Sequence, residues 1–178
     1  MNDLFLAQPD PSWKAAAEEY VQAYQAAGES HIGGSCSMEQ SGSYEEWLEK
    51  IRGMYNPPAD SALSPATTFF AVRKEDRRIV GTIQVRHRLT EELRENGGNI
   101  GYAVRPDQRK KGYATQMLFL ALDFCRGLGL NRVLLDCLAD NIASEKTIRR
   151  CGGVLAEEVT APGDDGQPGR IKRFWIEL

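Results

Sequence analysis

Hydrophobic residues recur along the chain at two spacings, which predict helices and strands in turn. Near the N-terminus, apolar residues three or four positions apart predict one helix from Ser12 to about Ala27. A second helix begins at Ser43 and ends before Pro57. Strand-favouring residues then predict six strands, over 67–73, 79–87, 99–104, 132–138, 154–160 and 170–177. Between these strands the spacing predicts a helical turn over 89–98 and helices over 115–126 and 143–150.

The alternation of strands and helices predicts an α/β fold with a mixed central sheet and helices on both faces. Strands 99–104 and 132–138 flank a helix, so we expect them to be parallel neighbours joined by a right-handed crossover. Residues 56–66 are rich in Pro, Ala and Ser and predict a linker within the domain, and 163–169 predicts an exposed turn. We therefore expect one domain over 1–178.

Composition excludes several classes of protein. The 178 residues are 42% hydrophobic and 26% charged, with a net charge of −3, which gives no sign of a nucleic-acid binder. No apolar run reaches membrane-spanning length, and the N-terminus does not resemble a signal peptide. The four cysteines lack metal-site spacing, so we expect free thiols in a reducing cytoplasm and no bound metal: Cys36, Cys125, Cys137 and Cys151.

Residues 99–115 combine a strand, a basic turn and the start of a helix. Pro106 ends the strand, and Arg109, Lys110 and Lys111 precede Gly112. A helix that follows such a turn presents unpaired amides and the positive end of its dipole, which suit a pyrophosphate. The alternative is a solvated basic turn. The spacing matches neither G-x-x-x-x-G-K-[ST] nor G-x-G-x-x-G, which excludes a Walker loop and a dinucleotide fingerprint.

The segment Arg109–Ala114 resembles the acyl-CoA loop of the GNAT (Gcn5-related) N-acetyltransferases, Q/R-x-x-G-x-G/A after a Val-x-Pro strand end, here Val104–Pro106. Asn141–Ser144 resembles the second signature of that family, and Gly152 ends the following helix where the family usually carries Gly-Phe. The resemblance covers roughly residues 67–178. It implies a GNAT-like, mostly antiparallel sheet in which strands 99–104 and 132–138 splay apart around the pantetheine arm. Residues 1–66 would form a helical acceptor-side part and 67–178 the acyl-CoA-binding core.

The resemblance also implies an activity and a binding site. The protein would transfer the acetyl group of acetyl-CoA to a primary amine of a small molecule or peptide by direct attack. An amide of Ala103 or Val104 would donate to the thioester oxygen. Asn141 is alternatively a helix N-cap, and Ser144 a first-turn residue. The expected cofactor-binding residues are Ala103, Val104, Arg109, Lys110, Lys111, Gly112, Tyr113, Ala114, Thr115, Asn141 and Ser144.

The catalytic groups depart from the family pattern. Many members carry a Tyr seven residues after the Asn, where it protonates the leaving thiolate, but this chain has Ile148, and Gly153 replaces the usual Phe. Tyr102 is the candidate acid, although packing is the usual role of an aromatic residue in a strand. His87, at a strand end, is the candidate base, or else an exposed hairpin histidine. Further candidates for acceptor recognition or proton transfer are Tyr113, His31, Glu39, Asp136 and Asp140.

Two other functions stay open. A non-catalytic acyl-CoA binding or sensing module on the same fold would bind CoA tightly, and acetylation would not change when His87 or Tyr102 is altered. A generic phosphate or nucleotide binder would accept ATP as well as CoA. We also expect that the final strands could form a homodimer interface.

Overall fold

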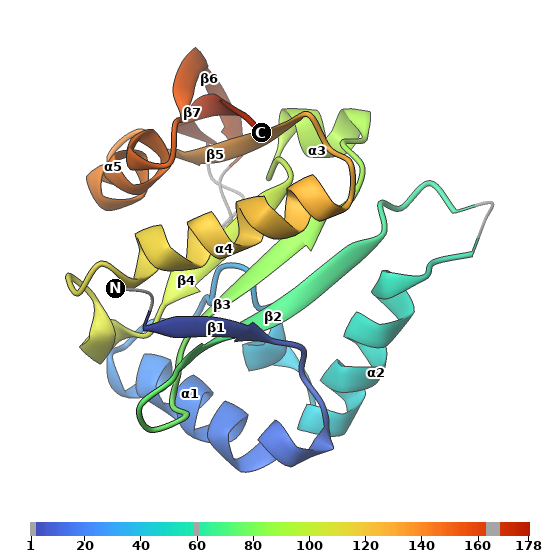
Figure 1. The fold of residues 1–178 in the computed structure, drawn as a ribbon, viewed down its shortest axis with the longest axis vertical. Helices are drawn as coiled ribbons and strands as arrows, with labels where there is room; N and C mark the ends of the chain where they lie inside the picture. The colour runs from blue at the N-terminus through green and yellow to red at the C-terminus, as the bar shows by residue number, and fades with distance from the viewer. Residues whose placement is uncertain (1–2, 59–60, 163–167) are drawn as a thin grey trace.

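The computed structural model describes residues 3–58, 61–162 and 168–178, and its strands form two antiparallel sheets (Figure 1). The first sheet has the order β1-β2-β3-β4, with strands Leu4–Ala7, Ala66–Arg73, Ile79–Arg86 and Ile100–Val104. The second has the order β5-β7-β6, with β5 at Arg132–Leu138, β6 at Val154–Pro162 and β7 at Pro168–Glu177. The last strand therefore lies between β5 and β6.

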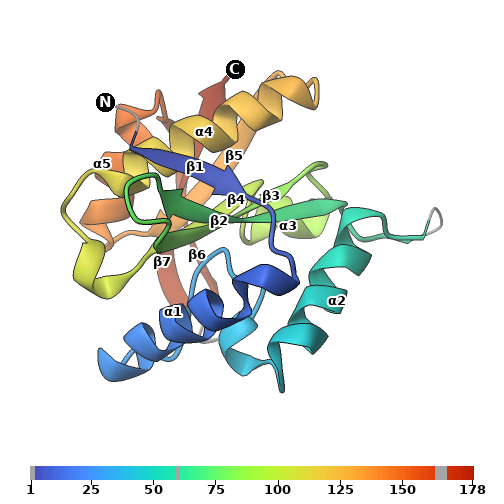
Figure 2. The same ribbon diagram turned by 60° about the horizontal axis from the view of Figure 1, so that its bottom comes forward.

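Helices cover both faces of the first sheet, as the sequence predicts (Figure 2). Helices α1 (Lys14–Ala26) and α2 (Tyr44–Tyr55) lie on one face and α4 (Tyr113–Gly127) on the other. Strand β2 serves both layers because successive side chains point to opposite faces. Phe70 belongs to the hydrophobic cluster of α1 and α2, whereas Phe69 belongs to the cluster that contains α4 and β5.

The shorter elements are helices α3 (Glu91–Glu95) and α5 (Ile142–Arg150) and three 3₁₀ turns, η1 (Pro11–Trp13), η2 (Met38–Gln40) and η3 (Pro106–Gln108). We expected the first helix to begin at Ser12, but α1 begins at Lys14. Asp10 caps the 3₁₀ turn instead, because its carboxylate accepts the amide of Ser12 at 2.7 Å. Strand β1 was not predicted from the sequence. Most of the turn expected over 163–169 lies outside the described residues.

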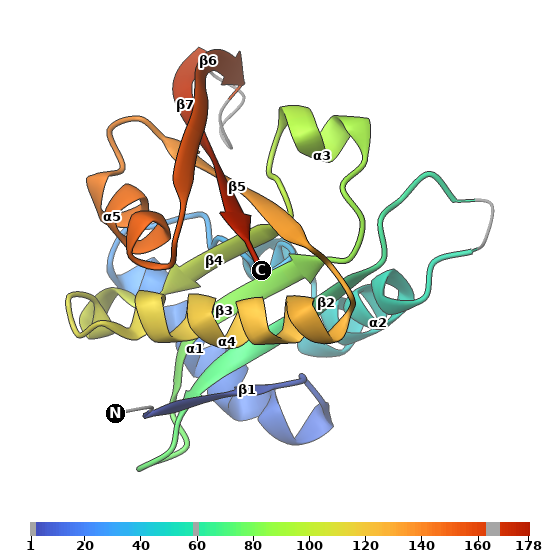
Figure 3. The same ribbon diagram turned by 45° about the horizontal axis from the view of Figure 1, so that its top comes forward.

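Strands β4 and β5 meet only at one point and then diverge (Figure 3). The backbone amide of Asn99 donates to the carbonyl of Leu134 at 2.7 Å, and the Leu134 amide donates to the Asn99 side-chain oxygen at 2.8 Å. Asn99 is 2% exposed, so its side chain forms a buried junction between the two sheets. The predicted fold class, a mostly antiparallel α/β fold with helices on both faces, is confirmed. The strands form two sheets and not one mixed central sheet, because β4 and β5 do not pair along their length.

Candidate functional site

The turn between β4 and α4 leaves a row of backbone amides unpaired. Lys110 and Gly112 have φ angles of 64° and 80°, and this left-handed backbone directs the chain into α4 at Tyr113, two residues earlier than predicted. Within the described residues, none of the amides of residues 110–115 donates a hydrogen bond to another atom of the chain. At Gly112 the positive φ angle favours glycine, whereas space does not, since a Cβ atom there would meet nothing within 4 Å. The turn is therefore an open, amide-lined anion site at a helix N-terminus.

The basic side chains of this turn differ in how far their charge is already paired within the protein. Arg109 makes a bidentate ion pair with Glu29, with both N–O distances 2.7 Å, and also donates to the carbonyl of Val104. Lys111 donates to the side-chain oxygen of Gln108 at 2.9 Å. Lys110 is exposed. Arg109 therefore ties the turn to the end of α1, and its charge is largely compensated.

The last three residues predicted to bind the cofactor, Tyr113, Ala114 and Thr115, lie in the first turn of α4. Tyr113 is buried, and its hydroxyl accepts a hydrogen bond from the Arg73 guanidinium at 3.4 Å. Ala114 and Thr115 are half-buried, with their amides unpaired.

The register of β4 decides which of its amides face the gap. The Arg105 amide donates to the Val80 carbonyl and the Asn99 carbonyl accepts the Arg86 amide, so these two backbone groups point at β3. Because this direction alternates along an antiparallel strand, Ala103, opposite Thr82, also faces β3. Tyr102 and Val104 face the other way. Of the two amides expected to bind the thioester oxygen, only that of Val104 is available.

A cavity of about 310 Å³ lies where β4 and β5 part. Its walls come from β4, β5, the start of α5 and the segment between α1 and α2. The residues that contribute from these elements include Gly101, Tyr102, Asp136, Cys137, Asn141, Ser144 and His31–Gly34. Two of the expected cofactor residues, Asn141 and Ser144, thus share one cavity with Tyr102.

Two hydroxyl groups meet across this cavity. The Tyr102 hydroxyl lies 3.0 Å from that of Ser144. Burial raises the pKa of Tyr102 to about 12, although its hydrogen bond to Ser144 acts in the opposite direction. The side-chain oxygen of Asn141 accepts the Ser144 amide at 3.1 Å, so Asn141 is the N-cap of α5 as well as a residue of the cavity wall. The two hydroxyls are placed to donate a proton or hydrogen bond to an atom in the cavity.

The positions where the chain departs from the family pattern are packing positions. Ile148 is fully buried in the core. Gly153 lies directly against it, because a Cβ atom at residue 153 would come 2.8 Å from the Ile148 carbonyl oxygen. A larger residue at 153 would clash, which explains the missing Phe.

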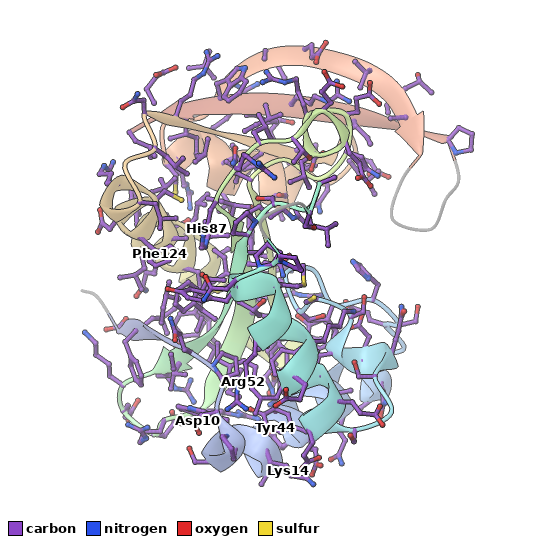
Figure 4. The ribbon with its side chains drawn as sticks, turned by 90° about the vertical axis from the view of Figure 1, so that its right-hand side faces the viewer. Asp10, Lys14, Tyr44, Arg52, His87 and Phe124 are labelled. Atoms are coloured by element: carbon purple, nitrogen blue, oxygen red, sulfur yellow. The ribbon has the colours of Figure 1, made fainter. Side chains whose placement is uncertain are left out.

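His87, the expected base, does not line the cavity. Its Nε2 lies 2.8 Å from the Thr67 hydroxyl, and its ring packs edge-on against Tyr55 and Phe124. Figure 4 labels His87 and Phe124 next to each other. Burial lowers the pKa of His87. The structure gives His87 a packing role, and we do not retain it as the base.

The other histidine, His31, does line the cavity and is paired with Glu39, whose Oε1 lies 3.4 Å from His31 Nδ1. Burial alone would raise the pKa of Glu39, but hydrogen bonds involving His31, Ser35 and two backbone amides lower it to about 2. Asp136 also lines the cavity and accepts the Gly97 amide at 2.7 Å, whereas Asp140 is exposed outside it.

Sequence reasoning missed two features of this site. The pair Gly33–Gly34 packs on the backbone of β4, and at Gly33 a Cβ atom would come 2.8 Å from the Tyr102 carbonyl oxygen. Adjacent glycines in a stretch that carries a histidine were the available signal. Cys137 faces the cavity, with its pKa raised by burial to about 11, and no local pattern marked it.

The described residues form neither a membrane-spanning helix nor a cluster of metal-ligand side chains. No helix there is both long and apolar enough to cross a membrane. In the same ranges, no three His, Cys, Asp or Glu side chains gather as metal ligands would.

Comparison with known families agrees with this geometry. A family model described as an acetyltransferase (GNAT) domain matches residues 7–154, which places the protein in the class of acetyltransferases. The chain belongs to the GNAT family. The resemblance predicted from the sequence is confirmed. No curated protein sequence matches the chain.

Solved structures show the same fold at low sequence identity. RimL, a ribosomal L7/L12 alpha-N-protein acetyltransferase in complex with coenzyme A, has a TM-score of 0.71 and 18% identity over 100% of this chain and 96% of its own. The microcin C7 self immunity acetyltransferase MccE, with acetyl-CoA and AMP, has a TM-score of 0.72 and 15% identity over 100% and 94%. A chimera of spermidine N-acetyltransferase SpeG, from Vibrio cholerae and hSSAT, has a TM-score of 0.68 and 15% identity over 98% and 95%.

Proposed function

We propose that the protein is an N-acetyltransferase that moves the acetyl group of acetyl-CoA to a primary amine by direct attack. The observation that carries this proposal is the row of unpaired amides at residues 110–115, directly after a strand that diverges from its neighbour. The titles of the similar structures, which name coenzyme A, acetyl-CoA and acceptors as different as a ribosomal protein and spermidine, support the reaction class and leave the acceptor open.

The cofactor would be held mainly by the backbone. The amides of residues 110–115 bind the diphosphate, and Lys110 and Lys111 add positive charge. Arg109 contributes indirectly, because its pairing with Glu29 fixes the turn. The pantetheine arm lies between β4 and β5, where Asn141 and Ser144 line the cavity.

The reacting atoms would meet two kinds of protein group in this gap, a backbone amide and a pair of hydroxyls. The neutral amine attacks the thioester carbon, so a carbon–nitrogen bond forms and the carbon–sulfur bond breaks. The nitrogen loses one proton to solvent, and the departing sulfur gains one. The amide of Val104, which faces away from β3, donates to the oxygen where negative charge develops. The Tyr102–Ser144 hydroxyl pair donates a proton or hydrogen bond to the departing thiolate. No covalent enzyme intermediate is needed.

One observation favours a second function. Ile148 is buried at the position where the family pattern has the Tyr that acts as general acid. A protein without that Tyr can bind acyl-CoA and not transfer the acyl group. In that case CoA binds tightly and no acceptor is turned over.

The same proposal divides the chain into an acceptor-side part and a cofactor-binding part. We take 1–178 as one cytoplasmic domain, with 67–178 as the acyl-CoA core and 1–66 on the acceptor side. The position of residues 31–34 in the cavity wall supports this division. The acceptor is a small-molecule or peptide amine. A homodimer through the final strands stays a prediction.

The test is release of free CoA thiol from acetyl-CoA in the presence of amines, with CoA affinity measured separately by calorimetry. The panel contains peptide N-termini, polyamines, amino acids and aminoglycosides. Turnover with at least one class, with the acetylated amine identified by mass spectrometry, supports the transferase. Tight CoA binding without any turnover across the panel supports the binding module, and the absence of CoA binding contradicts both.

A further inference from the structure

A chain of buried hydroxyl groups crosses the protein from helix α1 to the wall of the cavity. The Tyr24 and Tyr20 hydroxyls lie 3.2 Å apart on successive turns of α1, and the Tyr20 hydroxyl lies 3.2 Å from that of Thr82 on β3. The Thr82 hydroxyl donates to the Gly33 carbonyl at 3.0 Å, and Gly33 lines the cavity. The three residues that carry these hydroxyls are at most 1% exposed, so water does not compete for the hydrogen bonds.

The protons of this chain can point only one way. A carbonyl oxygen only accepts, so the single proton of Thr82 is used on Gly33, and the Thr82 oxygen must accept from Tyr20. The single proton of Tyr20 is then used as well, so Tyr20 accepts from Tyr24. Burial raises the pKa of both tyrosines, which keeps both hydroxyls protonated near neutral pH. The chain therefore runs in one direction, from Tyr24 to the Gly33 carbonyl.

The start of the chain lies against the turn that we propose binds the diphosphate. The guanidinium carbon of Arg109 lies 5.9 Å from the centre of the Tyr24 ring, close enough for a cation–π contact. The same guanidinium pairs with Glu29, just after α1, and donates to the Val104 carbonyl at 3.1 Å. Arg109 thus joins α1 and β4 to the row of unpaired amides that begins at residue 110.

The end of the chain holds the part of the cavity wall that packs on β4. Neither Gly33 nor Gly34 has room for a Cβ atom, because a carbonyl oxygen of β4 lies against each of them. The Thr82 hydroxyl fixes the Gly33 carbonyl from the neighbouring strand β3. The position of this wall therefore depends on the last hydroxyl of the chain.

We propose that Tyr20 and Tyr24 are positioning residues that couple the cofactor turn to the acceptor side of the cavity, so that bound CoA favours binding of the amine. This inference rests on the proposed transferase function. A diphosphate on the turn fixes Arg109, which restrains Tyr24 and, through it, the hydroxyls that end on Gly33. A wall that the cofactor has already ordered loses less conformational entropy when the amine binds, which gives positive cooperativity without a change of shape. By linkage, a bound amine tightens CoA binding by the same factor.

Packing alone is the competing explanation, because both tyrosines belong to the hydrophobic cluster of α1 and α2. Hydrogen exchange separates the two explanations. The amides of Ile32 and Ser35 donate within residues 32–39 at 3.1 and 3.2 Å, so their exchange reports the order of the wall. CoA should slow their exchange about 5-fold or more in wild type. In Tyr20→Phe, which keeps the ring but removes the middle hydroxyl, CoA should leave it unchanged. CoA that binds wild type without slowing these amides would overturn the inference and leave the transferase proposal standing.

Two further variants complete this experiment. Tyr24→Phe breaks the chain at its start, so it should lose the response to CoA as well, and it replaces Tyr20→Phe where that variant does not fold. Tyr44→Phe is the matched control, since Tyr44 is a buried tyrosine of the same layer whose hydroxyl donates to the Asp10 carbonyl at 2.7 Å, outside the chain. It should keep the response. A response that Tyr44→Phe loses to the same extent as Tyr20→Phe would assign the effect to packing and contradict the coupling.

The binding arm measures the coupling itself, with the panel amine that has the highest wild-type turnover. CoA carries no acetyl group, so calorimetry can follow binding of the amine to the free protein and to the CoA complex without reaction. CoA should tighten amine binding about 5-fold or more in wild type and Tyr44→Phe, but less than about 2-fold in Tyr20→Phe. Equal tightening in Tyr20→Phe contradicts the role of the hydroxyls. Wild type that does not bind CoA at all contradicts the proposed function, a result distinct from the loss of coupling.

Discussion

At the scale of single residues, the hydroxyls of Tyr102 and Ser144 carry the chemistry proposed for the leaving thiolate. They lie 3.0 Å apart on facing elements, so each can donate in turn. We expect Tyr102→Phe and Ser144→Ala each to lower kcat by about 10- to 100-fold, because one hydroxyl can partly replace the other. The double variant should lose more than the product of the two effects, because neither hydroxyl is then left to replace the other. Steady-state kinetics with CoA affinity measured in parallel would check this, and unchanged kcat in the double variant would argue for an unassisted leaving group.

Glu39 makes a second prediction at this scale. Its pKa in the folded protein is about 2, below the ordinary value of 4.5, so its stabilising effect is complete above pH 4.5 and is lost as the pH falls towards 2. The contribution is at most about 3 kcal/mol near neutrality. Denaturant unfolding at several pH values should show Glu39→Gln less stable than wild type at pH 6, with the difference shrinking by pH 3. A difference independent of pH would contradict the lowered pKa.

At the scale of elements, the segment over residues 31–37 is fixed on β4 by glycine. Gly34 has φ 70°, and a Cβ atom there would overlap the Gly101 carbonyl. We expect Gly34→Ala to lower the free energy of unfolding by about 2 kcal/mol or more and to raise KM for the acceptor, because the cavity wall must move. The control is Gly53→Ala in α2, where nothing lies within 4 Å and a gain of about 0.5–1 kcal/mol is expected. Equal stability of the two variants would rule out the close approach.

Several of the helices and strands could be predicted from the sequence, and others could not. Strands β2, β3 and β5 and helix α4 follow from their apolar and strand- or helix-favouring residues; β2 and β3 are buried on both faces. Strand β1 has only four residues, too few for a period to show. The segment around Gly33 has no periodicity at all, because its order comes from contacts with Thr82, Trp47 and β4 that are distant in sequence.

Within the site, the glycine turn was predictable because its signal is local. Gly112 and the basic residues before it stand next to each other, and the structure places Gly112 at the positive φ angle such a turn uses. Which of the two histidines lines the cavity was not predictable, since that depends on which side of the sheet a side chain reaches. His87 packs between aromatic rings, whereas His31, from a stretch without pattern, lines the cavity.

At the scale of the whole molecule, a ligand that binds only the folded state raises the melting temperature of the protein. CoA at 100 times its dissociation constant should stabilise the protein by about 2.7 kcal/mol, which corresponds to roughly 5–11 °C for a chain of this size. ATP can offer phosphates to the amides of residues 110–115 but has no arm to place between β4 and β5, so it should shift the melting temperature far less at equal concentration. Differential scanning fluorimetry measures both, and equal shifts would favour a generic nucleotide binder.

The central claim is that backbone amides of the turn hold the diphosphate while the gap between the two diverging strands holds the rest of the cofactor. A crystal structure of the complex with CoA tests it most directly. We predict diphosphate oxygens within hydrogen-bonding distance of the amides of residues 110–115, and the thiol in the cavity near Tyr102 and Ser144. A diphosphate bound elsewhere, with those amides facing solvent, would contradict the proposed site and the reaction built on it.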